Sequence, residues 1–181
     1  MKKILSVVLV LALLLGCASA LAEAPAKEKL GVISVNGQYT IQAALPEGYK
    51  VAVRYADVLY VRAAITKDEN SPKMELCVAY EDTNSDVERL NDLSDDDLAL
   101  LEVSFLDQND VEIEYRETAA GTKLMVVRET GDDQDFVVVF SIYKGCDVEL
   151  KLIAPENASV TEEQVQQCVD FLSNLDFVPA N

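Results

Sequence analysis

The side chains of this chain that could carry out chemistry are carboxylates and thiols, because it contains no histidine. Without an imidazole, Ser-His-Asp catalysis, Cys-His catalysis and histidine-ligated metal sites are all excluded. Walker A, GxGxxG and GxSxG sequences are absent as well, and the seven glycines are not clustered. A phosphate-binding loop is therefore not expected. These absences predict a protein that is not an enzyme and that binds no cofactor.

Carboxylates lie close together in two segments that could be metal sites. Asp132, Asp133 and Asp135 fall in a short turn and are weak candidates for a calcium site, although aspartate is also favoured in turns for its own backbone bonds. Residues 82–86 begin like a calcium loop, but Val87 stands where that loop needs glycine and Leu93 where it needs glutamate. We therefore expect no metal site.

Paired carboxylates could also hydrolyse glycosidic bonds if two of them faced each other about 5–10 Å apart across a cleft. With 32 acidic residues in the chain, some such pair is expected by chance, so the number of acids favours no enzyme.

Three cysteines follow the N-terminal region, namely Cys77, Cys146 and Cys168. Their number is odd, they form no CxxC, and their spacing matches no zinc site. Cys77 falls in an expected strand and Cys168 on the apolar face of an expected helix, so buried thiols are the first interpretation. A disulfide between two of them is an alternative, because disulfides persist outside the cytoplasm.

The N-terminus predicts export. Lys2 and Lys3 precede an apolar run over residues 4–15 and then small residues, which is typical of a signal peptide covering residues 1–22. Ala20-Leu21-Ala22 suits cleavage before Glu23. In the alternative, Leu14-Leu15-Gly16-Cys17 resembles a lipoprotein processing site, and an acyl group on Cys17 would tether the protein to a membrane. Either route predicts a secreted or extracytoplasmic protein.

The 159 residues that remain after residue 22 suit one domain, which we expect over residues 31–181 after a short tether at 23–30. They carry 13 basic and 32 acidic residues, a net charge of −19. This charge repels phosphate backbones and anionic lipids, so nucleic-acid binding is not expected. No stretch of this part is long and apolar enough to span a membrane.

Alternation of apolar and polar residues predicts most of the secondary structure as strands. The strands are expected near residues 39–43, 51–55, 59–65, 74–80, 111–115, 122–129, 136–143 and 148–152. Residues 122–129 and 136–143 are apolar on both faces and predict central strands. Asp147, Glu149 and Lys151 alternate with apolar residues and predict an outer strand. Short, turn-rich connections predict an antiparallel meander.

Two capping boxes mark the starts of helices. One begins at Ser94 and the other at Thr161, whose helix carries Val165 and Cys168 on its apolar face. A shorter helix is expected from Ser85 to Leu90. Because the central strands need cover on both faces, the sequence predicts an α+β fold, an antiparallel sheet with helices packed on both faces.

The order of these elements resembles the PsbP-like fold, shared by an extrinsic photosystem subunit, a Ran-binding protein and many bacterial envelope lipoproteins. The resemblance rests on the strand at residues 39–48, which ends in Pro46-Glu47-Gly48, on the mid-chain helix, the meander and the terminal helix. It covers most of the chain after residue 22. It implies an α/β/α sandwich and, because members are mostly binding or assembly factors, a role other than catalysis.

The sequence therefore predicts an exported, non-enzymatic accessory or binding domain of the bacterial cell envelope or secretome, whose partner is a protein or a small ligand. Two alternatives stay open. One is a small enzyme that works through carboxylates or a thiol, and the other is a structural surface module whose acidic surface keeps it soluble. An exposed apolar patch would favour the binding domain.

Overall fold

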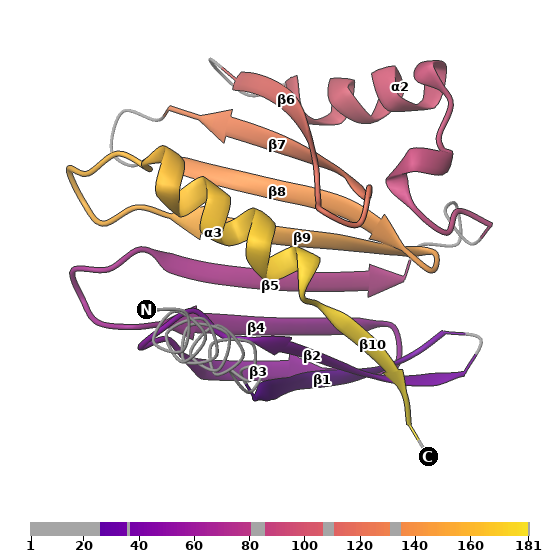
Figure 1. Ribbon diagram of the computed structural model, residues 1–181, viewed down its shortest axis with the longest axis horizontal. Helices are drawn as coiled ribbons and strands as arrows, with labels where there is room; N and C mark the ends of the chain where they lie inside the picture. Colours follow the sequence, from indigo (N-terminus) through magenta and orange to yellow (C-terminus); the bar gives the residue numbers. More distant parts are fainter. Residues whose placement is uncertain (1–25, 36, 81–85, 107–110, 131–134, 181) are drawn as a thin grey trace, which may run out of the picture.

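The computed structural model describes residues 26–35, 37–80, 86–106, 111–130 and 135–180. These residues form a seven-stranded sheet, a three-stranded sheet and two α-helices (Figure 1). The strands are β1 (Lys27–Ser34), β2 (Gln38–Ala44), β3 (Lys50–Ala56), β4 (Tyr60–Thr66), β5 (Lys73–Tyr80), β6 (Val111–Glu117), β7 (Lys123–Glu129), β8 (Phe136–Tyr143), β9 (Cys146–Ile153) and β10 (Asp176–Pro179). The helices are the 3-10 turn η3 (Leu90–Asp92), α2 (Asp95–Leu106) and α3 (Glu162–Ser173).

The seven-stranded sheet has the order β3-β4-β5-β9-β8-β7-β6, and every neighbouring pair is antiparallel. The predicted meander is confirmed in β6 to β9, and β8 is buried on both faces as predicted. The prediction that residues 148–152 form an outer strand is wrong, because β9 pairs with β5 on one side and β8 on the other. The polar side chains of β9 occur because one face of the sheet is uncovered there by the described residues, and not because β9 is an edge strand.

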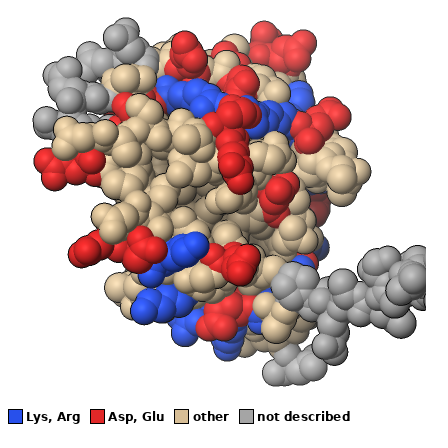
Figure 2. All heavy atoms as spheres, turned by 60° about the vertical axis from the view of Figure 1, so that its left-hand side comes forward, with Lys and Arg blue, Asp and Glu red and all other residues tan. Residues whose placement is uncertain are grey.

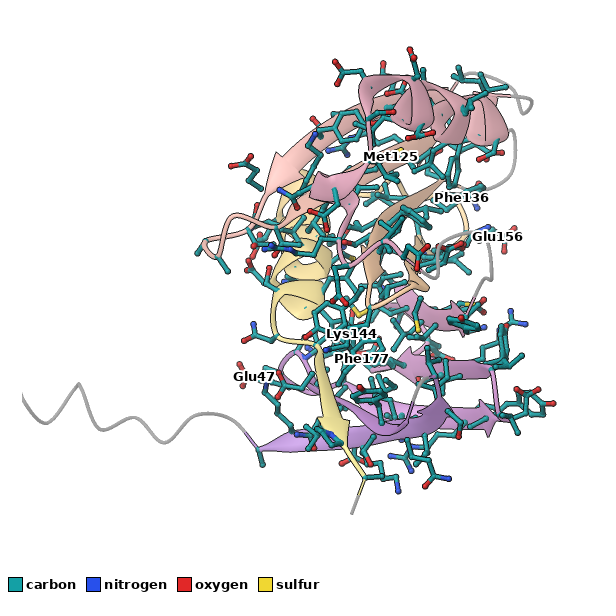
Figure 3. The ribbon with its side chains drawn as sticks, turned by 90° about the vertical axis from the view of Figure 1, so that its right-hand side faces the viewer. Glu47, Met125, Phe136, Lys144, Glu156 and Phe177 are labelled. Carbon is teal, nitrogen blue, oxygen red and sulfur yellow. The ribbon has the colours of Figure 1, made fainter. Side chains whose placement is uncertain are left out.

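One face of this sheet is covered by the three-stranded sheet β1-β2-β10 together with α3 (Figures 1 and 3). Leu30, Ile33 and Ile41 of the small sheet join one buried cluster with Val61 of β4 and Leu76 of β5. Strands from the beginning and the end of the described chain therefore close the main core.

Among the described residues, those that cover the opposite face lie over β6, β7 and β8. There α2 and η3 bury Leu90 and Leu98 against Met125 and Phe140, and the Phe105 ring meets the Phe140 ring edge-on at 6.1 Å. The rest of this face, over β3, β4, β5 and β9, carries half-buried and exposed side chains.

The predicted α/β/α sandwich with helices on both faces is therefore wrong. The described chain is mostly β and forms two sheets. The three-stranded sheet β1-β2-β10 covers much of the face on which the sandwich would have a helical layer. Alternation correctly showed an apolar face in most strands but not in β3, where a register shift puts Val51 and Val53 on opposite faces. It could not show that the cover would be strands, because β1 and β10 pair with β2 from far away in the sequence.

Three local predictions have mixed outcomes. The tether predicted at residues 23–30 is too long, because residues 27–30 belong to β1 and Leu30 is fully buried. The helix predicted from Ser85 to Leu90 is wrong over its described part, where only the short turn η3 forms, beginning at Leu90. The capping box at Thr161 is confirmed, because Thr161 Oγ1 accepts from the Gln164 amide at 3.3 Å and Gln164 Oε1 accepts from the Thr161 amide at 2.9 Å. At Ser94 one half of the box is confirmed: Ser94 Oγ accepts from the Asp97 amide at 3.2 Å, while the Asp97 carboxylate accepts from the Ser94 hydroxyl.

Within the described residues, neither α2 nor α3 has the length and hydropathy that crossing a membrane requires.

Candidate functional site

The predicted site residues are only partly visible in the structure. Cys17, Asp132 and Asp133 lie outside the described residues. Asp135 is half-buried at the start of β8, and its carbonyl oxygen accepts from the Ala154 amide at 3.1 Å. The described residues contain no group of three or more His, Cys, Asp or Glu side chains arranged to hold a metal ion. Asp132, Asp133 and Asp135 therefore remain weak candidates, and the expectation of no metal site stays a prediction.

The three cysteines after the N-terminal region are free thiols, so the alternative of a disulfide among them is wrong. Burial raises the pKa of Cys168 to about 12 and that of Cys146 to about 11. Burial also raises the pKa of the half-buried Cys77 thiol. A nucleophilic cysteine needs a lowered pKa, because the thiolate is the reactive form. These environments therefore suit structural thiols.

Three carboxylates in the described chain have a pKa below the ordinary value. A hydrogen bond from Ser71 lowers the pKa of Asp68, one from Lys73 lowers that of Glu75, and one from Arg116 lowers that of Glu162. A general acid at neutral pH needs the opposite, a raised pKa. Asp68 accepts from the Ser71 hydroxyl and the Asn70 amide, whereas Glu75 and Glu162 form ion pairs. Glu162 joins the start of α3 to Arg128 of β7 at 2.6 Å.

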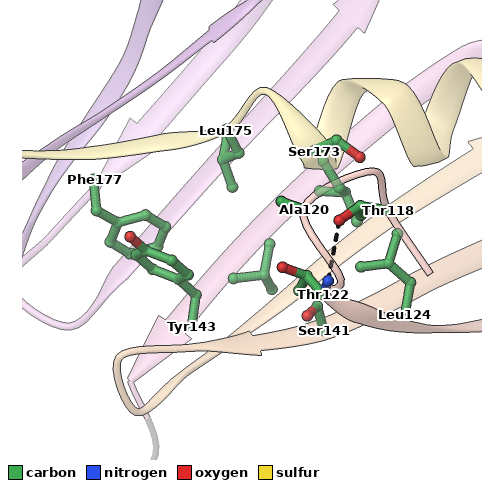
Figure 4. A pocket seen from close by; sticks show the side chains of 11 residues that line it. Thr118, Ala120, Thr122, Leu124, Ser141, Tyr143, Ser173, Leu175 and Phe177 are labelled. Carbon is green, nitrogen blue, oxygen red and sulfur yellow. Dashed lines mark hydrogen bonds between the residues drawn. The ribbon is translucent and has the colours of Figure 1, made fainter. Parts of the chain in front are cut away.

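A small pocket lies between the end of α3, β10 and the β6–β7 turn (Figure 4). The Tyr143 and Phe177 rings, 4.6 Å apart, form one wall, and Thr118 Oγ1 accepts from the Thr122 amide at 3.1 Å at the other end. All its lining residues are uncharged. Its volume of about 100 Å³ is below the roughly 300 Å³ at which typical small-molecule sites begin. Its hydroxyl groups can hydrogen-bond a small polar group, but the pocket contains no carboxylate, amine or thiol that could act as an acid or base.

The largest unusual feature is an exposed apolar surface at one end of the seven-stranded sheet. Val53 and Tyr55 of β3 and Val58 and Leu59 of the β3–β4 turn keep 48% to 65% of their surface exposed. We call these four residues the β3 surface. A shallow depression adjoins them, lined by Asp57, Val58, Leu59, Tyr60, Ala79 and Tyr80. Large apolar side chains gathered in this way on a surface mark interaction sites.

The β3 surface lies beside an unpaired strand edge. Among the strands that the structure describes, β3 pairs with β4 alone, and six of its seven residues are exposed. In the register of the sheet, Val53 stands opposite Ala64 and Tyr55 opposite Arg62, so both point to the uncovered face. The Tyr55 and Tyr60 rings lie 6.1 Å apart on that face. An edge strand with adjacent apolar side chains can accept an added strand from a partner.

Sequence reasoning missed this surface. The alternation predicted that Val51, Val53 and Tyr55 share one apolar face, which is wrong. The register shifts between Val51 and Val53, so Val51 stands opposite the buried Ile65 and packs against the main core, whereas Val53 and Tyr55 point to the other face. Residues of α2 give a second example, because Leu100, Val103 and Leu106 are 54% to 71% exposed. A helix that is apolar on most sides signals a further contact beyond the one with its own sheet.

No family model matches the chain, and a search of curated proteins finds no match. The resemblance to the PsbP-like fold therefore remains a prediction, without the sandwich that it implied.

Proposed function

We propose that this chain is an exported, non-enzymatic binding domain that holds another polypeptide at the β3 surface. The observation that carries the proposal is the exposure of Val53, Tyr55, Val58 and Leu59 beside an unpaired sheet edge. Burying such side chains removes apolar area from water, which favours association by roughly 25 cal/mol for each Å². The open edge adds main-chain hydrogen bonds, which give affinity without demanding one sequence.

The alternative of a small enzyme receives less support from the described groups. The thiols have raised pKa values, and the carboxylates with shifted pKa values are lowered, so neither set is tuned for nucleophilic or acid catalysis. The alternative of a structural module with a featureless acidic surface does not account for the exposed valine, leucine and tyrosine side chains of the β3 surface.

Photo-crosslinking in the native host tests the proposal. A benzoyl-phenylalanine placed at residue 58 should yield a discrete adduct, because Val58 is 65% exposed within the β3 surface. The same group at residue 163, an exposed position of α3 far from β3, is the control and should yield none. Val53→Asp should lower the adduct at residue 58 several-fold. The absence of any adduct at residue 58, or equal adducts at both positions, would contradict the proposal.

A further inference from the structure

The charges of the chain are separated along its length. Residues 26–80 contain seven basic and six acidic residues, whereas residues 81–181 contain six basic and 25 acidic residues. The first segment forms β1 to β5, and the second forms α2, β6 to β9, α3 and β10. The two unpaired edges of the large sheet, β3 and β6, therefore lie at opposite ends of an electrically polar molecule (Figure 1). In Figure 2, basic side chains gather at the lower end, and carboxylates are more frequent at the upper end.

The two edges complement each other in length, charge and surface type. Both strands have seven residues. β3 carries Lys50 and Arg54, of which Arg54 already pairs with Glu28 of β1. β6 carries three glutamates and a single arginine, and its Glu114 already pairs with Arg116 and Arg128. The difference in charge between the two edges therefore rests on Lys50 of β3 and on Glu112 and Glu117 of β6. β6 also has apolar surface at its side, because Tyr115 is exposed and α2 lies next to it with exposed leucine and valine side chains.

We propose that the partner of the β3 surface is a second copy of this chain, bound through its β6 edge, so that the sheet continues from one copy into the next. This inference rests on the proposed function and names its partner. Because neighbours alternate in direction across seven strands, β3 and β6 run the same way. Copies in the same orientation therefore join by a parallel strand pair, and the contact is head-to-tail.

Charge disfavours a symmetric pairing of β6 with β6. In a full-length antiparallel pair, Glu114 would stand opposite Glu114 of the second copy, and like charges opposite each other destabilise a strand pair. Each copy also carries a large negative net charge, which opposes any association. At about 0.15 M salt the Debye length is only about 8 Å, so this distant repulsion is screened while charges in contact still interact.

Two edge variants and their mixture test the head-to-tail contact. The weight-average mass of the wild-type protein, measured by light scattering at about 0.15 M salt, should at least double between low and high concentration. Val53→Asp blocks the β3 edge and Glu112→Lys blocks the β6 edge, so each variant alone should stay monomeric. Mixed in equal amounts, the two variants should form a single dimer, because each supplies the edge that the other lacks.

Matched controls place the same substitutions elsewhere. Val178→Asp changes an exposed strand valine of β10, and Glu163→Lys changes an exposed carboxylate of α3, and both should assemble like the wild type. Melting temperatures show whether each edge variant is folded, and Tyr55→Asp and Glu117→Lys replace any variant that is not.

A wild-type protein that stays monomeric, a mixture that stays monomeric, or a Glu112→Lys variant that still dimerises would each overturn the inference. The photo-crosslinked adduct separates this failure from failure of the proposed function. An adduct of twice the chain mass supports a second copy. An adduct with a different polypeptide keeps the binding function and overturns self-assembly, and the absence of any adduct contradicts both.

Discussion

Gly31 of β1 lies directly against the side chain of Val61 of β4. A Cβ atom built on Gly31 would stand 2.6 Å from Val61 Cγ1 and 2.8 Å from Val61 Cγ2, closer than real contacts allow. The small sheet therefore rests on the large one through a glycine, and residue 31 has no room for a side chain.

Gly31→Ala should lower the free energy of unfolding by about 1–3 kcal/mol, because an inserted methyl group forces the packed layers apart. Val61→Ala should make space for it. In urea denaturation, the double variant Gly31→Ala/Val61→Ala should lose about 1 kcal/mol less unfolding free energy than the losses of the two single variants added together. Strict additivity would show that the two residues are not in contact.

Phe177 of β10 belongs to the main buried cluster, and its ring lies 4.6 Å from that of Tyr143. Its side chain is buried, so Phe177→Ala should lower the free energy of unfolding by about 3 kcal/mol. Val178→Ala, one residue further along the same strand, is the control. Because Val178 is 39% exposed, its substitution should cost less than about 0.5 kcal/mol. Equal losses of stability in the two variants would mean that Phe177 is not the buried residue of this pair.

The ion pairs of Glu75 with Lys73 and Arg62 predict a pH dependence. The hydrogen bond from Lys73 holds the folded-state pKa of Glu75 below its unfolded value of about 4.3. The stability that this pairing contributes is therefore present above that value and is lost as pH falls through the folded-state pKa.

Urea denaturation at several pH values measures this effect. Wild type should exceed Glu75→Gln in unfolding free energy at pH 5 to 7, and the gap should close as pH falls below about 4. Glu163→Gln, a substitution at a carboxylate outside this cluster, should show no such gap. A gap that widens on acidification would mean that Glu75 is stabilised in its protonated form.

Thiol reactivity follows from burial. With iodoacetamide at pH 8, the folded protein should react slowly at the half-buried Cys77 and not at the buried Cys146 and Cys168, whose pKa values are raised to about 11 and about 12. In concentrated urea all three should react at similar rates, as peptide mapping by mass spectrometry would show. Rapid labelling of Cys168 in the folded state would show that α3 leaves the sheet.

Some elements of the fold are predictable from short stretches of sequence. The helix starts at Ser94 and Thr161 are of this kind, because a capping box is satisfied by side chains only three residues apart. The burial of strands β7 and β8 is predictable because both of their faces are apolar. The lack of histidine removes whole classes of active site on residue type alone.

Other features depend on contacts between distant residues. The alternation in β9 and that in β3 look alike, yet β9 is central, and β3 is an edge strand with Val53 and Tyr55 in water. Short-range patterns report which side chains share a face only where the strand has no bulge, and the register shift between Val51 and Val53 breaks the pattern in β3. They do not report which element covers that face.

The sequence by itself therefore determined that the chain alternates into antiparallel strands, where its helices begin, and which catalytic chemistries it lacks, because these properties depend on residue types and near neighbours. Only the tertiary structure decided that β1 and β10 build a second sheet, that Gly31 meets Val61, and that Val53, Tyr55, Val58 and Leu59 stay exposed. Each of these depends on strands brought together from distant parts of the chain, and the free energy of that pairing is not encoded in any one segment.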